Sequence, residues 1–148
     1  MNLPGNGPTP QDGGGDDTVH VMVVDDSAVI RGLLARTLES DPSIRVVASV
    51  GNGQMALNAL QRTDVEVVIL DIEMPVMDGM TALPKLIAAS PGVQVIMAST
   101  LTHKNAAISL KALEQGAADY VTKPSSSGGL ISAKDFQREL TAKVKTLG

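Results

Sequence analysis

The sequence predicts an α/β fold of the doubly wound, three-layer kind, in which helices cover both faces of a parallel sheet. Two observations indicate this fold class. First, five short segments rich in β-branched residues alternate along the chain with five segments whose apolar residues recur at helical spacing. Second, several of the short segments are apolar at nearly every position, which is typical of strands covered on both faces. This alternation implies right-handed crossovers between parallel strands.

The predicted strands are short runs of mainly aliphatic residues, the first reading VHVMVV and the third VEVVIL. Such runs, bounded by polar residues and glycines, are typical of strands in a buried sheet. We therefore expect all five to lie in one sheet. They cover residues 19–24, 44–50, 65–70, 93–99 and 119–122.

The predicted helices show apolar residues three and four positions apart, such as Ile30 and Leu34 in the first. Pro42 follows the first helix and Gly116 follows the fourth, and both residue types are typical of helix ends. Pro84 lies within the third, where it is tolerable only near the first turn. The helices cover residues 28–39, 53–62, 79–89 and 104–115, and the last contains Phe136, Leu140, Val144 and Leu147.

Composition excludes several classes of protein. The 148 residues suit one domain, and aromatic residues are limited to Tyr120 and Phe136, so the core must be aliphatic. The formal charge of −4 and the lack of a basic tract disfavour nucleic acid and anionic membrane as partners. No stretch has the length of a membrane span. The absence of cysteine excludes disulfides and fits a cytoplasmic location.

The chain divides into a tail and one domain. Residues 1–17 are mostly Pro, Gly, Asn and Asp, and they cannot bury enough apolar surface to offset the entropy of ordering. We expect a disordered tail there and a folded domain over residues 18–148. A low-complexity loop, SSSGG at 125–129, precedes the last helix.

Charged and hydroxyl-bearing residues follow the predicted strands. The first strand is followed by Asp25 and Asp26, the third by Asp71, the fourth ends at Ser99, and the fifth is followed by Lys123. Each has an ordinary reading when taken alone, such as a helix cap or a solvated loop residue. Ligands of open α/β sheets bind outside the carboxyl ends of the strands, so we expect these side chains to meet at one edge.

Converging carboxylates predict a cation site. At about 4 Å, each pair costs on the order of 1 kcal/mol in water and about four times that at an effective dielectric of about 20. Mg²⁺ would offset this repulsion, because it prefers oxygen ligands and is held by one or two carboxylates with waters and phosphate oxygens. A remaining carboxylate could attack phosphorus to give an acyl phosphate, with a lysine and a hydroxyl stabilising the charge of the transferring group.

Four segments carry a family resemblance: VMVVDDSAVIR, VVILDIEMPVMDGM, VIMASTLT and GAADYVTKP. With these segments, residues 19–124 resemble the receiver domains of two-component response regulators. The resemblance implies a flavodoxin-like, CheY-like (βα)5 fold with strand order 2-1-3-4-5. The most specific part is the pattern D-x-x-M-P-x-x-D-G that starts at Asp71.

The resemblance also implies a role for each site residue. Asp71 matches the phosphoacceptor, and Lys123 and Ser99 the residues that contact the phosphoryl group. Ser99 and Tyr120 match the switch pair, whose movement changes the surface of the fourth helix, fifth strand and fifth helix. A histidine kinase would be the phosphodonor, and the Lys123–Pro124 bond could be cis. The implied Mg²⁺ ligands are Asp25, Asp26, Asp71 and the backbone carbonyl of Glu73.

The segments DDSAVIR, LDIEMP, STLT and KPSSS most resemble the N-terminal receiver of the chemotaxis protein-glutamate methylesterase CheB. In that family a C-terminal domain hydrolyses methyl esters of receptor glutamates. This chain has no G-x-S-x-G motif, and only His20 and His103 could act as a histidine base, so we expect no esterase site here. The chain is then the regulatory part of such an enzyme or a stand-alone receiver that acts by protein binding.

Two other functions fit single features of the sequence. Gly51, Gly53 and Ala56 form a G-x-G-x-x-A pattern between a strand and a helix, as in dinucleotide-binding proteins. That reading leaves most of the polar strand ends unexplained. A receiver fold used only as a constitutive docking module is the other alternative, and the complete set of acids speaks against it.

Overall fold

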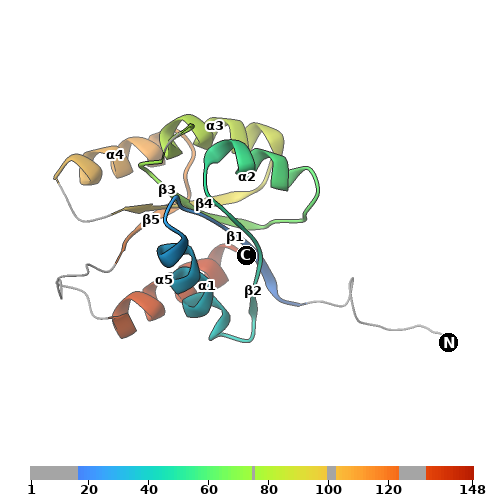
Figure 1. Ribbon diagram of the computed structural model, residues 1–148. Coiled ribbons are helices and arrows are strands. Elements are labelled where there is room, and N and C mark those ends of the chain that lie inside the picture. The colour runs from blue at the N-terminus through green and yellow to red at the C-terminus, as the bar shows by residue number, and fades with distance from the viewer. Residues whose placement is uncertain (1–16, 75, 100–102, 124–132) are drawn as a thin grey trace.

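A computed structural model describes residues 17–74, 76–99, 103–123 and 133–148, and in them it confirms the predicted fold class. One parallel sheet has the strand order β2-β1-β3-β4-β5. Figure 1 shows α2, α3 and α4 on one face of this sheet and α1 and α5 on the other. The elements are β1 (Val19–Val24), α1 (Ala28–Glu39), β2 (Ile44–Val50), α2 (Gly53–Leu60), β3 (Val67–Asp71), α3 (Gly79–Ala89), β4 (Gln94–Ser99), α4 (His103–Glu114), β5 (Asp119–Thr122) and α5 (Ala133–Leu147).

The register of the strands aligns the ends that carry the polar residues. Val24 of β1 lies opposite Leu70 of β3, so Asp25 and Asp71 are the next residues on adjacent strands. On the other side, Ser99 at the end of β4 lies opposite the last residue of β5. Topology therefore brings the sequence-predicted site to one edge, because all five carboxyl ends point the same way.

Two aliphatic layers hold the sheet between its helices. Alternate strand residues face opposite sides, so β1 contributes Met22 and Val24 to the layer under α2 and α3, and Val21 and Val23 to the layer under α1 and α5. Phe136, the only phenylalanine, is buried in the second layer. The strands are thus apolar at successive positions because both of their faces are covered.

Three of the helices have an N-cap residue whose side chain accepts a hydrogen bond from the first turn. The side chain of Ser27 accepts from the amide of Ile30 at the start of α1, and Asn52 and Asp78 cap α2 and α3 in the same way. Gly116 follows α4 as predicted, and its φ of 114° is the left-handed conformation that glycine adopts easily.

Several details differ from the sequence prediction. α2 ends at Leu60 rather than at residue 62, α4 covers His103–Glu114 rather than 104–115, and β4 begins at Gln94 rather than at Val93. Pro84 lies in the middle of α3 rather than in its first turn, on an exposed part of the helix, so the hydrogen bond it cannot donate is lost on the solvent side. The third strand begins at Val67 rather than at Val65. The chain is nevertheless already paired before Val67, because the Glu66 amide donates to His20 and its carbonyl accepts from Gln94.

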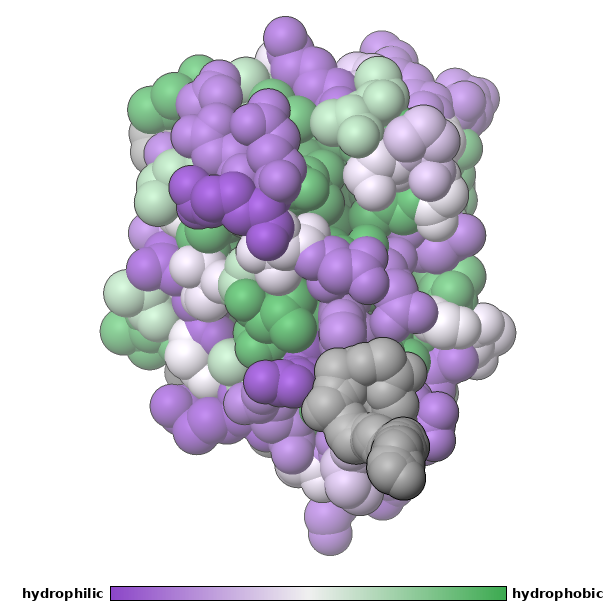
Figure 2. Space-filling model, turned by 90° about the vertical axis from the view of Figure 1, so that its right-hand side faces the viewer, coloured by the Kyte–Doolittle hydropathy of each residue, from purple (hydrophilic) through white to green (hydrophobic). Residues whose placement is uncertain are grey.

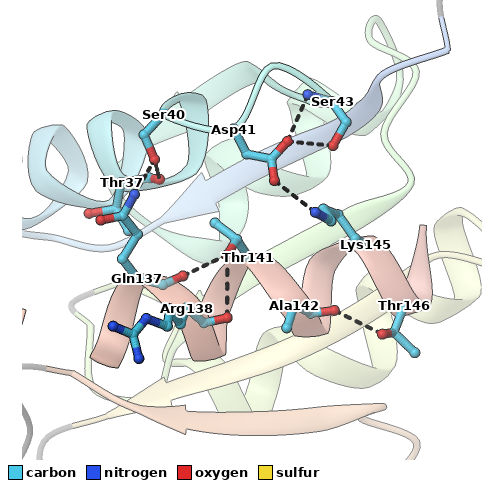
Figure 3. Close-up of polar contacts among 10 residues, drawn as sticks. All are labelled: Thr37, Ser40, Asp41, Ser43, Gln137, Arg138, Thr141, Ala142, Lys145 and Thr146. Carbon is cyan, nitrogen blue, oxygen red and sulfur yellow. Dashed lines mark hydrogen bonds and ion pairs between the residues drawn. The ribbon is translucent and has the colours of Figure 1, made fainter. Parts of the chain in front are cut away.

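Side chains hold α5 against the turn between α1 and β2 (Figure 3). Asp41 accepts hydrogen bonds from the amide and hydroxyl of Ser43 and pairs with Lys145 of α5 at 2.9 Å. Gln137 of α5 donates to the hydroxyl of Ser40. The Ser43 hydrogen bonds, followed by Lys145, lower the pKa of Asp41 to about 2. These contacts fix one face of the helix that carries Phe136.

Side chains also form hydrogen bonds with backbone groups on the two edge strands. On β2, the carboxylate of Glu39 accepts from the Val46 amide at 3.1 Å, close to where the register with β1 shifts. On β5, the ammonium of Lys143 donates to the Tyr120 carbonyl at 2.7 Å. Figure 2 views the side on which β2 is the edge, and apolar groups there lie in small patches among polar ones. Among the described residues, none of the helices is long and apolar enough to cross a bilayer.

Candidate functional site

Three carboxylates meet at the carboxyl edge of the sheet. Asp25 and Asp26 follow β1 and Asp71 ends β3, and each offers an oxygen within 4.8 Å of the others. Asp25 and Asp71 are 1% and 5% exposed, whereas Asp26 is exposed to solvent. The convergence predicted from the sequence is confirmed for these three side chains.

Lys123, the residue after β5, contacts both buried acids. Its Nζ lies 3.0 Å from Asp25 Oδ2 and 3.0 Å from Asp71 Oδ1. The amide of Lys123 donates to the Ser99 carbonyl at 2.8 Å, which ties the lysine to the end of β4. The site therefore has a fixed cation on one side and the exposed Asp26 on the other.

Backbone and side-chain contacts fix Asp25 in place. Its Oδ1 accepts from the Ser27 amide at 2.9 Å, and its own amide donates to the Val50 carbonyl at 3.1 Å. The guanidinium of Arg31, in the first turn of α1, donates to the Asp25 carbonyl at 2.7 Å. These contacts preorganise the acid before any ligand binds.

Burial and charge act in opposite directions on the central pair. Burial raises the pKa of Asp71 from its ordinary value of 3.8 to about 6, although Lys123 opposes the rise and Asp25 and Asp26 add to it. Burial acts against the charged form of Lys123, but the charge of Asp71 and hydrogen bonds to Asp25 and Asp71 outweigh it, so the pKa of Lys123 is raised. Asp71 is therefore a poorly stabilised carboxylate, which a bound cation would stabilise.

The loop after β3 packs closely on the backbone of Asp71. The Gly79 amide donates to the Ile72 carbonyl at 2.8 Å, and a Cβ at Gly79 would lie 2.2 Å from the Asp71 carbonyl oxygen. Only glycine fits this approach. Val76 in the same loop has a φ of 69° and is 83% exposed, an unusual conformation for a β-branched residue.

The remaining predicted residues lie around the cluster rather than in it. Ser99 is buried at the end of β4, on the strand beside β3. Tyr120 lies on β5, three residues before Lys123, and is 39% exposed. Glu73 is exposed in the loop after Asp71, and the metal role of its carbonyl stays a prediction. Three further predictions lie outside the described residues, and they concern the Lys123–Pro124 bond, the loop 125–129 and residues 1–16 of the tail.

Sequence reasoning missed two contributors to this site. The Arg31 contact with Asp25 could not be read from spacing, because an arginine in a first helical turn is ordinarily solvated. The close approach of Gly79 did have a signal, since that glycine ends the D-x-x-M-P-x-x-D-G pattern, but the pattern alone does not say what the glycine contacts.

The glycine pattern after β2 has a packing explanation. Gly53 begins α2 behind the capping residue Asn52, and a Cβ there would lie 2.8 Å from Ala82 and 3.0 Å from Met77. Gly53 is therefore required where α2 meets α3, and Ala56 is buried in the core below. Gly53 and Ala56 need no bound dinucleotide to account for them.

The donor set at the edge of the sheet fits Mg²⁺. All three side chains supply carboxylate oxygens, the ligand type that this ion prefers, and one of the three acids, Asp26, is exposed to solvent. The chemistry that the arrangement allows is attack by a carboxylate on a phosphoryl group whose charge a lysine and a metal ion neutralise.

Comparison with known proteins gives one consistent result. Residues 21–135 match the family described as response regulator receiver domain. A protein-glutamate methylesterase/protein-glutamine glutaminase of Rhodospirillum centenum is 64% identical over 135 residues, which are 91% of this chain and 34% of that protein. Its counterpart in Azospirillum brasilense is 63% identical over 94% of this chain and 35% of that protein. The chain thus spans about a third of the length of these relatives.

Solved structures agree with the sequence relatives. The response regulator domain of Thermotoga maritima CheB has a TM-score of 0.76 and 37% identity, covering 88% of this chain and 96% of that one. A structure of the P1 domain of CheA3 in complex with CheY6 from R. sphaeroides contains a chain with a TM-score of 0.70 and 33% identity, covering 88% of this chain and 97% of that one.

Proposed function

The chain belongs to the response regulator receiver domain family as a receiver of the chemotaxis CheB type, and on that premise we propose that Asp71 accepts a phosphoryl group from a histidine kinase. The observation that carries the proposal is the cluster of Asp25, Asp26 and Asp71 with Lys123 at 3.0 Å from two of them. We assign residues 18–148 to this receiver domain.

Asp71 is the nucleophile in the proposed transfer. One of its carboxylate oxygens forms a bond to phosphorus while the bond from phosphorus to the donor's imidazole nitrogen breaks, and the released imidazole takes up a proton. Burial destabilises the ionised carboxylate of Asp71 before the reaction, as its raised pKa shows. That cost is partly removed as the negative charge moves on to the phosphoryl oxygens.

Lys123 and Ser99 are placed to receive that charge. The ammonium of Lys123 already contacts Asp71 and can follow the charge on to the new phosphoryl group. Ser99 lies at the end of the neighbouring strand, from which its hydroxyl can donate to a phosphoryl oxygen. We assign both residues to phosphoryl contact.

Mg²⁺ would be held by Asp25, Asp26, Asp71 and the backbone carbonyl of Glu73. When bound, it supplies charge neutralisation between the acids and the phosphoryl oxygens. Of the three acids, Asp26 is the best placed as a direct ligand, because it is exposed, while Asp25 and Asp71 are already paired with Lys123.

The output of phosphorylation would be a change at the surface of α4, β5 and α5. Movement of Ser99 towards the phosphoryl group would let Tyr120 turn inward, and a ligand can shift this equilibrium only by its differential interaction with the two states.

Because the chain spans about a third of its methylesterase relatives, the regulated activity would be that of an esterase domain. The alternative is a stand-alone receiver that binds other proteins.

Intact-mass spectrometry with acetyl phosphate and Mg²⁺ tests the proposal. Wild type should gain the mass of one phosphoryl group, and Asp71→Asn should gain none. Asp64→Asn is the matched control, because Asp64 is an exposed acid outside the cluster. Wild type that stays unmodified would favour a constitutive docking module, and modification of Asp71→Asn would place the acceptor elsewhere.

A further inference from the structure

Lys143 of α5 makes four contacts around Tyr120. Its Nζ donates to the Tyr120 carbonyl at 2.7 Å and to Asp119 Oδ1 at 3.2 Å, and it pairs with Glu139 at 3.1 Å. The same nitrogen lies 5.6 Å from the centre of the Tyr120 ring, within the range of a cation–π contact. One half-buried ammonium thus joins α5 to both the backbone and the ring of Tyr120.

The side chain of Lys143 reaches Tyr120 around the outer edge of the sheet. Val121 packs in the layer under α5, so Tyr120, one residue earlier, points to the opposite face of β5. Lys143 reaches it from α5 past the side of β5 that faces away from β4. The Tyr120 amide bonds Asp119 Oδ1 at 2.7 Å, so Asp119 and Lys143 together occupy both backbone polar groups of Tyr120.

We propose that Lys143 is a positioning residue that holds the Tyr120 ring in its half-exposed place and thereby opposes the phosphorylated state. The inference rests on the proposed function, in which the ring turns inward after phosphorylation. An inward ring would leave the ammonium and lose the cation–π contact, whereas the carbonyl contact does not require the ring to stay outside. The contact therefore favours the unphosphorylated arrangement.

Lys143 has a simpler role that does not involve the switch. A lysine over an edge strand blocks pairing with another chain, and the bond to the Tyr120 carbonyl serves that role by itself. The two roles differ in one measurable way. If Lys143 only blocks the edge, it does not couple the position of the Tyr120 ring to the binding of a phosphoryl group. If Lys143 is a positioning residue, it does.

Beryllofluoride, a phosphoryl mimic, gives an equilibrium measurement. Its apparent dissociation constant is measured by calorimetry in saturating Mg²⁺ for wild type, Lys143→Met and Lys143→Arg. Loss of a partly exposed cation–π contact should tighten binding to Lys143→Met about two- to fivefold. Lys143→Arg keeps a cation over the ring and should bind as wild type does.

Lys145→Met is the matched control. Lys145 lies on the same helix and forms an ion pair of similar length, but with Asp41 on the turn after α1. Its removal should weaken the attachment of α5 and leave beryllofluoride affinity unchanged. Equal tightening by Lys145→Met and Lys143→Met would mean that any loosening of α5 has the effect, and the inference would be wrong.

A double-mutant cycle with Tyr120→Leu separates the two roles of Lys143. If the lysine acts through the ring, Lys143→Met should change beryllofluoride affinity in the wild-type background and leave it unchanged in the Tyr120→Leu background. Identical effects in both backgrounds would assign the lysine to the edge alone and overturn the inference.

Tyrosine fluorescence gives a second measurement that does not require phosphoryl chemistry. Tyr120 is the only tyrosine and there is no tryptophan, so the emission reports this ring alone. Without ligand, acrylamide should quench Lys143→Met less than wild type, because the freed ring spends more time inside. If wild type binds no beryllofluoride, the proposed function is wrong. Unchanged quenching in Lys143→Met is a separate outcome, and it would show that the lysine does not hold the ring.

Discussion

At the scale of single residues, Asp71 combines two conflicting requirements. It must be ionised to attack phosphorus, yet it is 5% exposed and lies beside two other acids. Lys123 reduces the conflict without removing it, since the pKa of Asp71 still rises to about 6. The unliganded protein is therefore less stable with this carboxylate ionised than with it neutral.

Asp71→Asn should stabilise the metal-free protein at neutral pH. The pKa of Asp71 in the folded state, about 6, lies above its ordinary value of 3.8, so the folded state binds the proton more tightly and wild type loses stability as pH rises between these values. Asparagine resembles the neutral acid and avoids this loss. Urea unfolding with a chelator should show a gain of about 1–3 kcal/mol at pH 7.5.

The same measurement at pH 4 provides the control. At pH 4 the acid is almost fully protonated in the folded state and only partly ionised in the unfolded state, so the advantage of Asp71→Asn should shrink to about 0.5 kcal/mol. A constant difference from pH 4 to pH 7.5 would show that the substitution acts through packing instead of through charge.

The sequence identified the acids but not their energetics. A carboxylate at the end of an apolar strand predicts where Asp71 lies, because strand order and direction are regular. The contacts of Lys123 with Asp25 and Asp71 at 3.0 Å depend on side chains from elements far apart in sequence. No local sequence pattern predicts these contacts. Neither the pairing of Lys123 with the two acids nor the raised pKa of Asp71 could therefore be derived before the fold was known.

At the scale of elements, the loop between β3 and α3 is the most strained part of the site described. It must bring Gly79 against the backbone of Asp71. Val76 has a positive φ in this loop, and a β-branched side chain makes that conformation costly. Such strain is typical of functional loops whose shape is imposed by their surroundings.

Val76→Gly should therefore stabilise the protein. Relief of strain contributes on the order of 1–2 kcal/mol, and the greater freedom of glycine in the unfolded chain offsets about half of it, so the midpoint of urea unfolding should rise by the equivalent of about 1 kcal/mol. Val29→Gly is the matched control, because Val29 is 78% exposed in helix α1. It should lose up to about 0.5 kcal/mol. A destabilised Val76→Gly would mean that the valine side chain makes a favourable contact.

Element boundaries were predictable where both ends carry local signals. The first helix is found at residues 28–39 as expected, because Ser27 caps it at the start. The last helix begins at Ala133, three residues before the first apolar residue used to predict it. The three residues before Phe136 include no large apolar side chain, so hydrophobic spacing could not reveal them. The proline inside α3 shows that packing overrides local propensity.

At the scale of the whole molecule, stability should depend on Mg²⁺. A ligand that binds only the folded state stabilises it by mass action, by about 2.7 kcal/mol at a concentration one hundred times the dissociation constant. For a chain of this size that corresponds to a rise in Tm of roughly 5–10 °C. Differential scanning calorimetry with and without Mg²⁺ checks this expectation.

Asp26→Asn should lose most of this rise in Tm and remain folded. Asp26 is exposed, so its replacement creates no cavity. Asp64→Asn is the control and should keep the full response to Mg²⁺. An undiminished response in Asp26→Asn would remove this residue from the set of metal ligands.

The arrangement of the whole sheet was predictable from alternation together with family resemblance. Alternation alone indicates parallel strands and helices on both faces, but it does not order the strands. The order 2-1-3-4-5 came from the resemblance and is confirmed. Tertiary details, such as the attachment of α5 through Asp41 and Lys145, involve residues far apart in sequence and had no signal in it.

The side chains on the two edge strands bear on how the protein behaves at high concentration. An unpaired strand edge can template the addition of a strand from a second molecule, which is a route to fibrous aggregates. Here Glu39 occupies the Val46 amide on β2, and Asp119 and Lys143 occupy the amide and carbonyl of Tyr120 on β5. At these positions an approaching chain would have to displace a charged group before it could bond, so each end of the sheet carries a barrier to self-association.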